Sequence, residues 1–129
     1  MALDPHALPD EVLAFLRERH LATLTTLRGD GSPHVVPVGF SFDPDAVVAR
    51  VITFAPAVKA RNAARGGRAA VSQVDGARWL TLEGPVQLVT DPDGVAAAVA
   101  GYTERYRPPK QRDDRVALEI AVDKVMGRG

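Results

Sequence analysis

A group of cations without nearby acids marks the part of this chain best suited to bind an anion. Residues 46–74 contain five cations and no Asp or Glu, although the whole chain has 16 acidic side chains for its 16 basic ones. Lys59, Arg61 and Asn62 lie on a short segment between two apolar runs. A helix that begins there would offer free N–H donors and a positive dipole end to an anion. The pattern predicts a site for a phosphate-bearing ligand, with a solvated basic face as the alternative.

Motifs for several other chemistries are missing from the sequence. It contains no GxSxG, no Gly-rich dinucleotide fingerprint, no GKS/T loop and no HExxH. His6, His20 and His34 are scattered without the spacing of metal ligands, so we expect no metal site. The absence of cysteine excludes a disulfide framework, a thiolate zinc site and a thiol nucleophile. If the protein is an enzyme, a bound cofactor is expected to supply the reactive group.

Composition limits the classes of partner. The length of 129 residues fits one domain, spanning 1–129, and the apolar fraction of 46% is typical of a globular protein. A net charge of zero and a pI near 6.8 argue against nucleic acid or a membrane surface as the partner. The longest apolar run, residues 95–100, is too short to span a bilayer, and residues 1–11 lack the apolar stretch of a secretory signal. We therefore expect a cytoplasmic protein.

Apolar periodicity predicts the elements that must position the candidate anion site. The predicted helices cover residues 10–20, 57–64 and 91–106, and the predicted strands cover residues 21–27, 34–40, 47–54, 69–74, 79–89 and 116–122. Residues 41–45 are expected to form a turn, and Gly84-Pro85 a bulge in the fifth strand. The cations of residues 107–114 could cover a ligand or lie in solvent, and we expect solvent. Six mostly antiparallel strands with short helices predict a mainly β (α+β) fold, a closed or nearly closed barrel.

Two features of the predicted strands suit a flat ligand. Pro37 cannot donate to a ladder, so its strand is expected at an edge or bulged there. The face that carries Val35, Pro37 and Gly39 is small enough to leave room for a planar group, with an ordinary edge strand as the alternative. Trp79, the single tryptophan, directly follows Arg78 and is predicted either to anchor the core or to stack on a ligand.

Three segments resemble a known family. The runs FLRERHLATLTTLR, SPHVVPVGF and SQVDGARWL, together with KARN at residues 59–62, are similar to the flavin-binding split β-barrel proteins typified by pyridoxamine 5'-phosphate oxidase. Within that family they resemble the actinobacterial branch that uses the deazaflavin coenzyme F420, and biliverdin reductases in particular. The resemblance extends from about residue 10 to residue 126. It implies a six-stranded antiparallel split barrel of the FMN-binding type.

The resemblance also implies a homodimer with two cofactor sites at the subunit interface, part of each coming from the second subunit. The strand matching His34, Val35, Val36, Pro37 and Val38 would lie along the deazaflavin ring. Other matching residues would meet the phosphate and tail or complete the site: Thr53, Lys59, Arg61, Asn62, Ser72, Gln73, Arg78, Trp79 and Leu80. The chain ends at Gly129 soon after its last predicted strand, so any contact made by a longer family tail would be missing or already lie within residues 107–114.

The function implied is hydride transfer from reduced coenzyme F420 to a conjugated substrate, with biliverdin as the first candidate. Arg78 is predicted to be the catalytic residue, because its charge would neutralise a developing anion or hold a substrate carboxylate. Two alternatives stay open on sequence alone. One is a flavin enzyme that binds FMN, and the other is a carrier of a cofactor or tetrapyrrole without catalysis.

Overall fold

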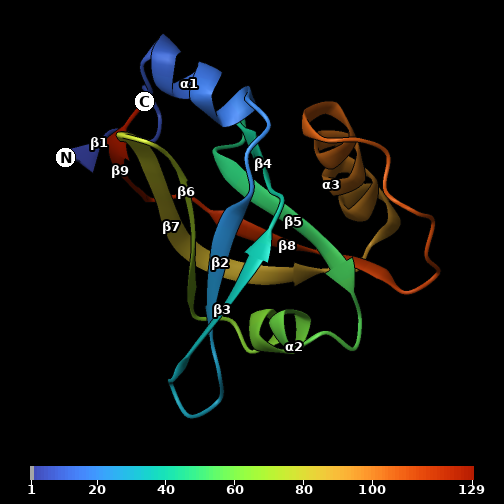
Figure 1. The fold of residues 1–129 in the computed structure, drawn as a ribbon. Coiled ribbons are helices and arrows are strands. Elements are labelled where there is room, and N and C mark those ends of the chain that lie inside the picture. The colour runs from blue at the N-terminus through green and yellow to red at the C-terminus, as the bar shows by residue number, and fades with distance from the viewer. Residues whose placement is uncertain (1) are drawn as a thin grey trace.

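The computed structural model describes residues 2–129, which fold into one curled sheet flanked by helices (Figure 1). Within this range the elements follow one another as β1 (Ala2–Leu3), α1 (Asp10–Arg17), β2 (Ala22–Leu27), β3 (Pro33–Val38), β4 (Ser41–Asp43), β5 (Val48–Phe54), α2 (Val58–Ala64), β6 (Arg68–Asp75), β7 (Arg78–Val89), α3 (Pro92–Arg105), β8 (Arg115–Ala121) and β9 (Lys124–Arg128).

All strand pairs are antiparallel, as predicted. The main path through the sheet runs β3-β2-β6-β7-β8-β5-β4, and β9 pairs with both β7 and β1. Among residues 2–129 no ladder joins β3 to β4, so the sheet curls round without closing, as in a split barrel. Among residues 2–129 β3 pairs only with β2, which confirms the edge position that Pro37 indicated. The pairing of β1 with β9 also brings the two chain ends together (Figure 1).

Strict alternation along the strands creates the core. β2, β5 and β6 bury every second side chain, and α1 adds Val12, Phe15 and Leu16 from one face. Full burial of one such large apolar side chain contributes about 1.5–3 kcal/mol. The large side chains less than 2% exposed include Phe15, Leu24, Phe40, Leu80, Leu82, Leu118 and Ile120. All of these side chains belong to one apolar cluster that joins α1 to the inner face of the sheet.

The long strand β7 changes neighbours at Gly84. Residues 79–83 pair with β9, and residues 86–89 pair with β8. A Cβ on Gly84 would lie 1.8 Å from the carbonyl oxygen of Ala121, so only glycine allows the chain to pass this closely. The predicted bulge is wrong, because the register with β6 continues one to one through Gly84 and Pro85. The sequence signal there marks a crossing point of two chain segments.

Three short strands, β1, β4 and β9, were missed, so the predicted total of six is too low. Residues 41–43 form β4 because the turn begins only at Asp43, whose carboxylate accepts from the N–H groups of Asp45 and Ala46. β9 escaped notice because its buried positions are Val125 and Gly127, which give almost no alternation of apolar residues. The first helix also ends earlier than expected, since Glu18 is already extended.

The helices stand at different parts of the sheet. α1 and α2 lie at opposite ends of it in Figure 1, whereas α3 lies beside β4, β5 and β8. The predicted cap of α3 is confirmed, because the Asp91 carboxylate accepts from the N–H of Gly94 at 2.8 Å. No helix within residues 2–129 is both long and apolar enough to cross a membrane.

Candidate functional site

The larger of the two cavities described below has a volume of about 650 Å³. It opens where the end of β3, the end of β5, the start of α2, the end of α3 and the loop at residues 107–114 come together. Its walls combine apolar and aromatic groups with cations. The apolar and aromatic residues include Val38, Phe54 and Tyr102, and the cations include Lys59, Arg107 and Lys110. A cavity of this size, with a few convergent polar groups, is typical of a small-molecule site.

Lys59 provides the clearest electrostatic signal in the cavity. It lies in the first turn of α2, and its side chain is half-buried. Burial lowers the pKa of its ammonium group, and no carboxylate among residues 2–129 opposes that shift by pairing with it. A desolvated cation without a counterion favours binding of an anion, because the anion restores the lost solvation. This supports the predicted anion site over the solvated basic face.

Two buried polar atoms lack partners in the part of the chain that the structure describes. Thr53 is 3% exposed, yet its hydroxyl has no hydrogen-bond partner, and the residue lines the cavity beside Lys59. The Nδ1 atom of His34, on β3, is also buried and unpartnered. Leaving such a group unpaired costs about 1–3 kcal/mol, so each needs an explanation. A ligand in the cavity would supply a partner for Thr53.

The loop at residues 107–114 lines the cavity with cations that are also exposed, so both expectations for this loop hold in part. Arg112 donates to Asp114 and stacks 4.3 Å from the centre of the Phe54 ring, which anchors the loop to the end of β5. Arg112 also holds the pKa of the Asp114 carboxyl below its usual range. Arg107 and Lys110 line the same cavity from this loop. The loop therefore adds positive charge opposite Lys59.

Several cations of the acid-free residues 46–74 find partners elsewhere in the folded chain. Arg50 pairs with Asp43 and Glu119 at 3.1 and 3.2 Å, and Arg68 donates to Asp123. Arg65, in contrast, donates to the Leu27 carbonyl and to the side chain of Asn62. Lys59 and Arg61 are the cations of residues 46–74 that have no such partner among residues 2–129. Only Lys59 of these two lines the cavity.

The predicted site residues on β3 divide between its two faces. Pro37 and Val38 line the cavity near its mouth. Val35 is 55% exposed on the same side as Pro37, whereas Val36 packs against the core. The outward face is thus small and open, as predicted for a strand that lies along a planar group. The contacts of His34, Val35 and Val36 with a cofactor stay a prediction.

On α2 the two other predicted residues differ in their surroundings. Arg61 is exposed and points away from the lining of the cavity. Asn62 is 3% exposed, and its amide donates to the Thr26 hydroxyl at 3.0 Å and accepts from Arg65. Its hydrogen bonds fix α2 to β2, so in one chain it positions the helix that carries Lys59. Direct contact of either residue with a cofactor stays a prediction.

The residues predicted on β6 and β7 do not line this cavity within one chain. The Ser72 hydroxyl bonds to Thr81, and Leu80 is fully buried in the core. Gln73 is 1% exposed and bonds to the Phe15 carbonyl and the guanidinium of Arg105. Trp79 is half-buried opposite Val74 in the sheet. Their predicted roles would require a second subunit and stay predictions.

Arg78, the predicted catalytic residue, lies in a separate charged corner near α1. Its guanidinium donates to both carboxylate oxygens of Glu18 at 2.9 Å and also to Asp75, and it stacks 4.3 Å from the centre of the Phe15 ring. These hydrogen bonds lower the pKa of Glu18 to about 2. A guanidinium that is already paired with two carboxylates is less available to bind a substrate. Its catalytic role stays a prediction.

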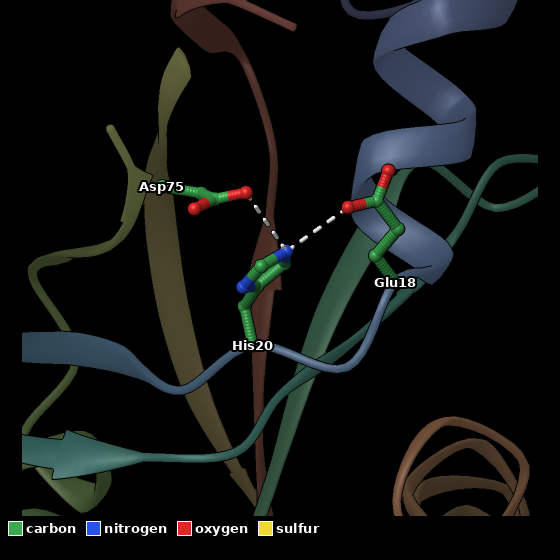
Figure 2. A group of neighbouring side chains, drawn as sticks. All are labelled: Glu18, His20 and Asp75. Atoms are coloured by element: carbon green, nitrogen blue, oxygen red, sulfur yellow. Dashed lines mark hydrogen bonds and ion pairs between the residues drawn. The ribbon is translucent and has the colours of Figure 1, made fainter. Parts of the chain in front are cut away.

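The same corner gathers three side chains with metal-binding chemistry, which the sequence spacing did not indicate. Figure 2 shows His20 between Glu18 and Asp75, at 3.1 and 3.9 Å from their carboxylate oxygens. Their ligand atoms lie within 4.8 Å of one another. Arg78 already donates to both acids. The group is therefore best described as an ion-paired link between α1 and β6.

Sequence reasoning missed the aromatic part of the site. Tyr102 and Phe54 line the cavity, and Tyr106 packs beside Tyr102 with ring centres 5.0 Å apart. The available signal was the i, i+4 spacing of the two tyrosines at the end of the predicted helix, which places them on one face. Gly39 makes this possible, because a Cβ there would lie 3.0 Å from both rings.

Comparison with known proteins connects this site to a family. A family model described as pyridoxamine 5'-phosphate oxidase matches residues 8–128. A biliverdin reductase from Mycobacterium tuberculosis (strain CDC 1551 / Oshkosh) that depends on reduced coenzyme F420 is 55% identical over 120 residues. The alignment covers 93% of this chain and 88% of that protein.

Solved structures support the fold. A conserved hypothetical protein from Mycobacterium tuberculosis superposes with a TM-score of 0.78 at 22% identity, covering 95% of this chain and 85% of that one. A structure described as an F420 reductase superposes with a TM-score of 0.74 at 26% identity, covering 92% of this chain and 98% of the other. The predicted fold class and family resemblance are confirmed.

Proposed function

Because this chain belongs to the pyridoxamine 5'-phosphate oxidase family, we propose that it is an oxidoreductase that reduces biliverdin with reduced coenzyme F420. The identity of 55% with a biliverdin reductase of that cofactor type carries the proposal. The large cavity agrees with it, because the cavity combines an unpaired lysine with aromatic walls. An anionic cofactor with a planar ring needs both features.

The residues present fit the cofactor. Lys59 would bind an anionic group of its tail, since its half-buried ammonium has no carboxylate partner among residues 2–129. The Thr53 hydroxyl, buried and unpartnered, would donate to the same molecule. Pro37 and Val38 at the edge strand would lie along the ring. The carboxylate-free lining of the cavity makes this assignment specific for an anion.

When bound, reduced coenzyme F420 supplies a hydride to an electrophilic carbon of the conjugated substrate. The chain's own contribution is to bind, orient and exclude water. Phe54 and Tyr102 form apolar walls, and the Arg112–Phe54 stack holds the loop at residues 107–114 over the opening. Binding both reactants in one site already removes their translational and rotational freedom, so the activation barrier for hydride transfer is lower. A proton from solvent completes the reduction.

The proposed enzyme is a homodimer that acts in the cytoplasm. A second copy would cover the open sheet edge at β3, where Val35 is 55% exposed. It would also cover Val74, which is 68% exposed. A dimer would also explain why the predicted residues on β6 and β7 are absent from the cavity of one chain. Light scattering with the cofactor present should give the dimer mass, and a monomer mass would contradict this part.

Steady-state kinetics test the function. Oxidation of reduced coenzyme F420 should match the loss of biliverdin one to one, and NADPH should not replace it, because the chain lacks a dinucleotide fingerprint. Purified protein that is yellow with FMN and turns over only with that flavin would favour the flavin alternative. Tight binding of biliverdin without any turnover would favour the carrier.

A further inference from the structure

A second cavity, of about 360 Å³, adjoins the first at the end of α3. Arg19, Leu21, Tyr102, Tyr106 and Arg107 line it. Tyr102 and Arg107 also line the larger cavity. A ligand that extends beyond the larger cavity therefore reaches the smaller one by passing these two side chains.

The aromatic wall of the smaller cavity is rigid. The Tyr106 hydroxyl donates to the His20 carbonyl and accepts from the N–H of Phe40 at 3.3 Å, so its ring is fixed to the segment before β2 and to the segment after β3. Tyr102 packs against it at an interplanar angle of 34°. Two fixed rings and the exposed Leu21 offer an apolar surface to a conjugated ligand at little cost in side-chain entropy.

The two arginines of this cavity differ from the ion-paired arginines of the protein. Arg50, Arg68, Arg78 and Arg112 each have a carboxylate partner. Arg19 and Arg107 have none within residues 2–129, although both stand beside the same aromatic wall. A planar guanidinium without a partner is suited to a bidentate hydrogen bond with a carboxylate. The cavity thus combines an apolar wall with two free carboxylate-binding groups.

We propose that the smaller cavity binds a carboxylate arm of the substrate, with Arg19 and Arg107 as its ligands and Tyr102 and Tyr106 as the support for the adjoining conjugated ring. This deepens the proposed function and rests on it, because biliverdin is a conjugated molecule with two propionate arms. Lys59, which lines the larger cavity and not the smaller one, remains the group for the anionic cofactor. The two anions are therefore held by different cations.

The test is a binding titration of biliverdin and of its dimethyl ester, with oxidised coenzyme F420 present so that no turnover occurs. Arg19→Gln and Arg107→Gln should each weaken biliverdin binding roughly tenfold or more, the usual loss for one charge-assisted hydrogen bond. The ester should bind the wild type about as weakly and should lose nothing further in either variant. Arg17→Gln is the matched control, an exposed cation on α1 that lines neither cavity.

Kinetics separate this proposal from the proposed function. In Arg19→Gln the KM for biliverdin should rise while kcat stays near that of the wild type. If acid and ester bind equally, or if Arg19→Gln behaves like Arg17→Gln, the carboxylate site is wrong, even where biliverdin is reduced. If biliverdin binding depends on Arg19 but no turnover occurs, the site stands and the reductase function fails.

Discussion

The corner around Arg78 and the cavity around Lys59 hold their cations in opposite ways. At the corner, Glu18 and Asp75 surround one guanidinium with hydrogen bonds. At the cavity, a half-buried ammonium has no carboxylate partner in the described chain, and burial lowers its pKa. The first cation already has its counterions, while the second has none. The number of charged side chains in a region is thus a poorer guide to a binding site than a charged side chain without a partner.

Arg105 is held in a third way, which differs from the surroundings of both Arg78 and Lys59. Arg105 is 8% exposed. Its guanidinium donates to three neutral oxygens at 2.8 Å: the backbone carbonyls of Glu18 and Phe40 and the side-chain amide oxygen of Gln73. Burial lowers the pKa of this group. It joins α3 to the end of α1 and to the core of the sheet. The buried arginine therefore holds the helix from which the cavity loop continues.

Replacing Arg105 should give the largest effect. Arg105→Met keeps much of the apolar volume but leaves the Gln73 amide oxygen and the Phe40 carbonyl without their donor. Each unsatisfied buried acceptor costs about 1–3 kcal/mol, so the free energy of unfolding should fall by about 3 kcal/mol or more. Urea denaturation measures this loss directly.

The matched control is Arg107→Met, two residues along the chain and exposed. Its free energy of unfolding should stay within about 0.5 kcal/mol of the wild type. If Arg105→Met is as stable as this control, packing on the Phe40 and Tyr106 rings, 4.8 and 5.4 Å away, rather than hydrogen bonding would fix α3.

Lys59→Ala comes second and tests the cavity side of the comparison. Loss of one charge-assisted hydrogen bond should weaken binding of coenzyme F420 by about 1.5–3 kcal/mol, roughly ten- to a hundredfold. Calorimetric titration gives the affinity, and thermal unfolding should be almost unchanged. Arg17→Ala removes one charge elsewhere and should bind normally. Equal weakening in both variants would indicate a diffuse charge effect and no specific site.

Much of the fold was predictable because it depends on local patterns. The strict alternation of burial in β5, the cap at Asp91 and the proline of the edge strand each report one local property of the chain. β4 and β9 were not predictable in the same way. Their short ladders depend on pairing with β5 and β7, and three to five residues carry too little pattern to show it.

The candidate site was predictable only in part, for a related reason. Lys59 and Thr53 were identified, and both line the cavity. Arg78 looked equally free in the sequence, because Glu18, which accepts two of its hydrogen bonds, lies 60 residues away, although its other partner Asp75 is only three residues away. The basic loop at residues 107–114 looked solvated for the opposite reason, because its contact with Phe54 is also distant in the chain. Whether a cation has a partner is a tertiary property, and a local window does not contain it.

The smallest effect is expected at the exposed corner and appears only in acid. Hydrogen bonding from Arg78, and then from His20, lowers the pKa of Glu18 from 4.5 to about 2 in the folded state. A carboxylate with a depressed folded pKa stabilises the fold above its unfolded pKa and loses this contribution as pH falls toward the folded value. The contribution of Glu18 should therefore be complete above about pH 4.5 and gone near pH 2.

Glu18→Gln isolates this contribution from those of other paired acids such as Asp43 and Asp123, whose pKa values are also lowered. The wild type should be slightly more stable than the variant near neutral pH, and the two should converge between about pH 4.5 and pH 2. Because the corner is exposed, added salt should shrink the difference. Glu104→Gln, at an exposed position without an ion-pair partner in the described chain, should show no such convergence. A Glu18→Gln difference that stays constant with pH would mean that the corner does not stabilise the fold through charge.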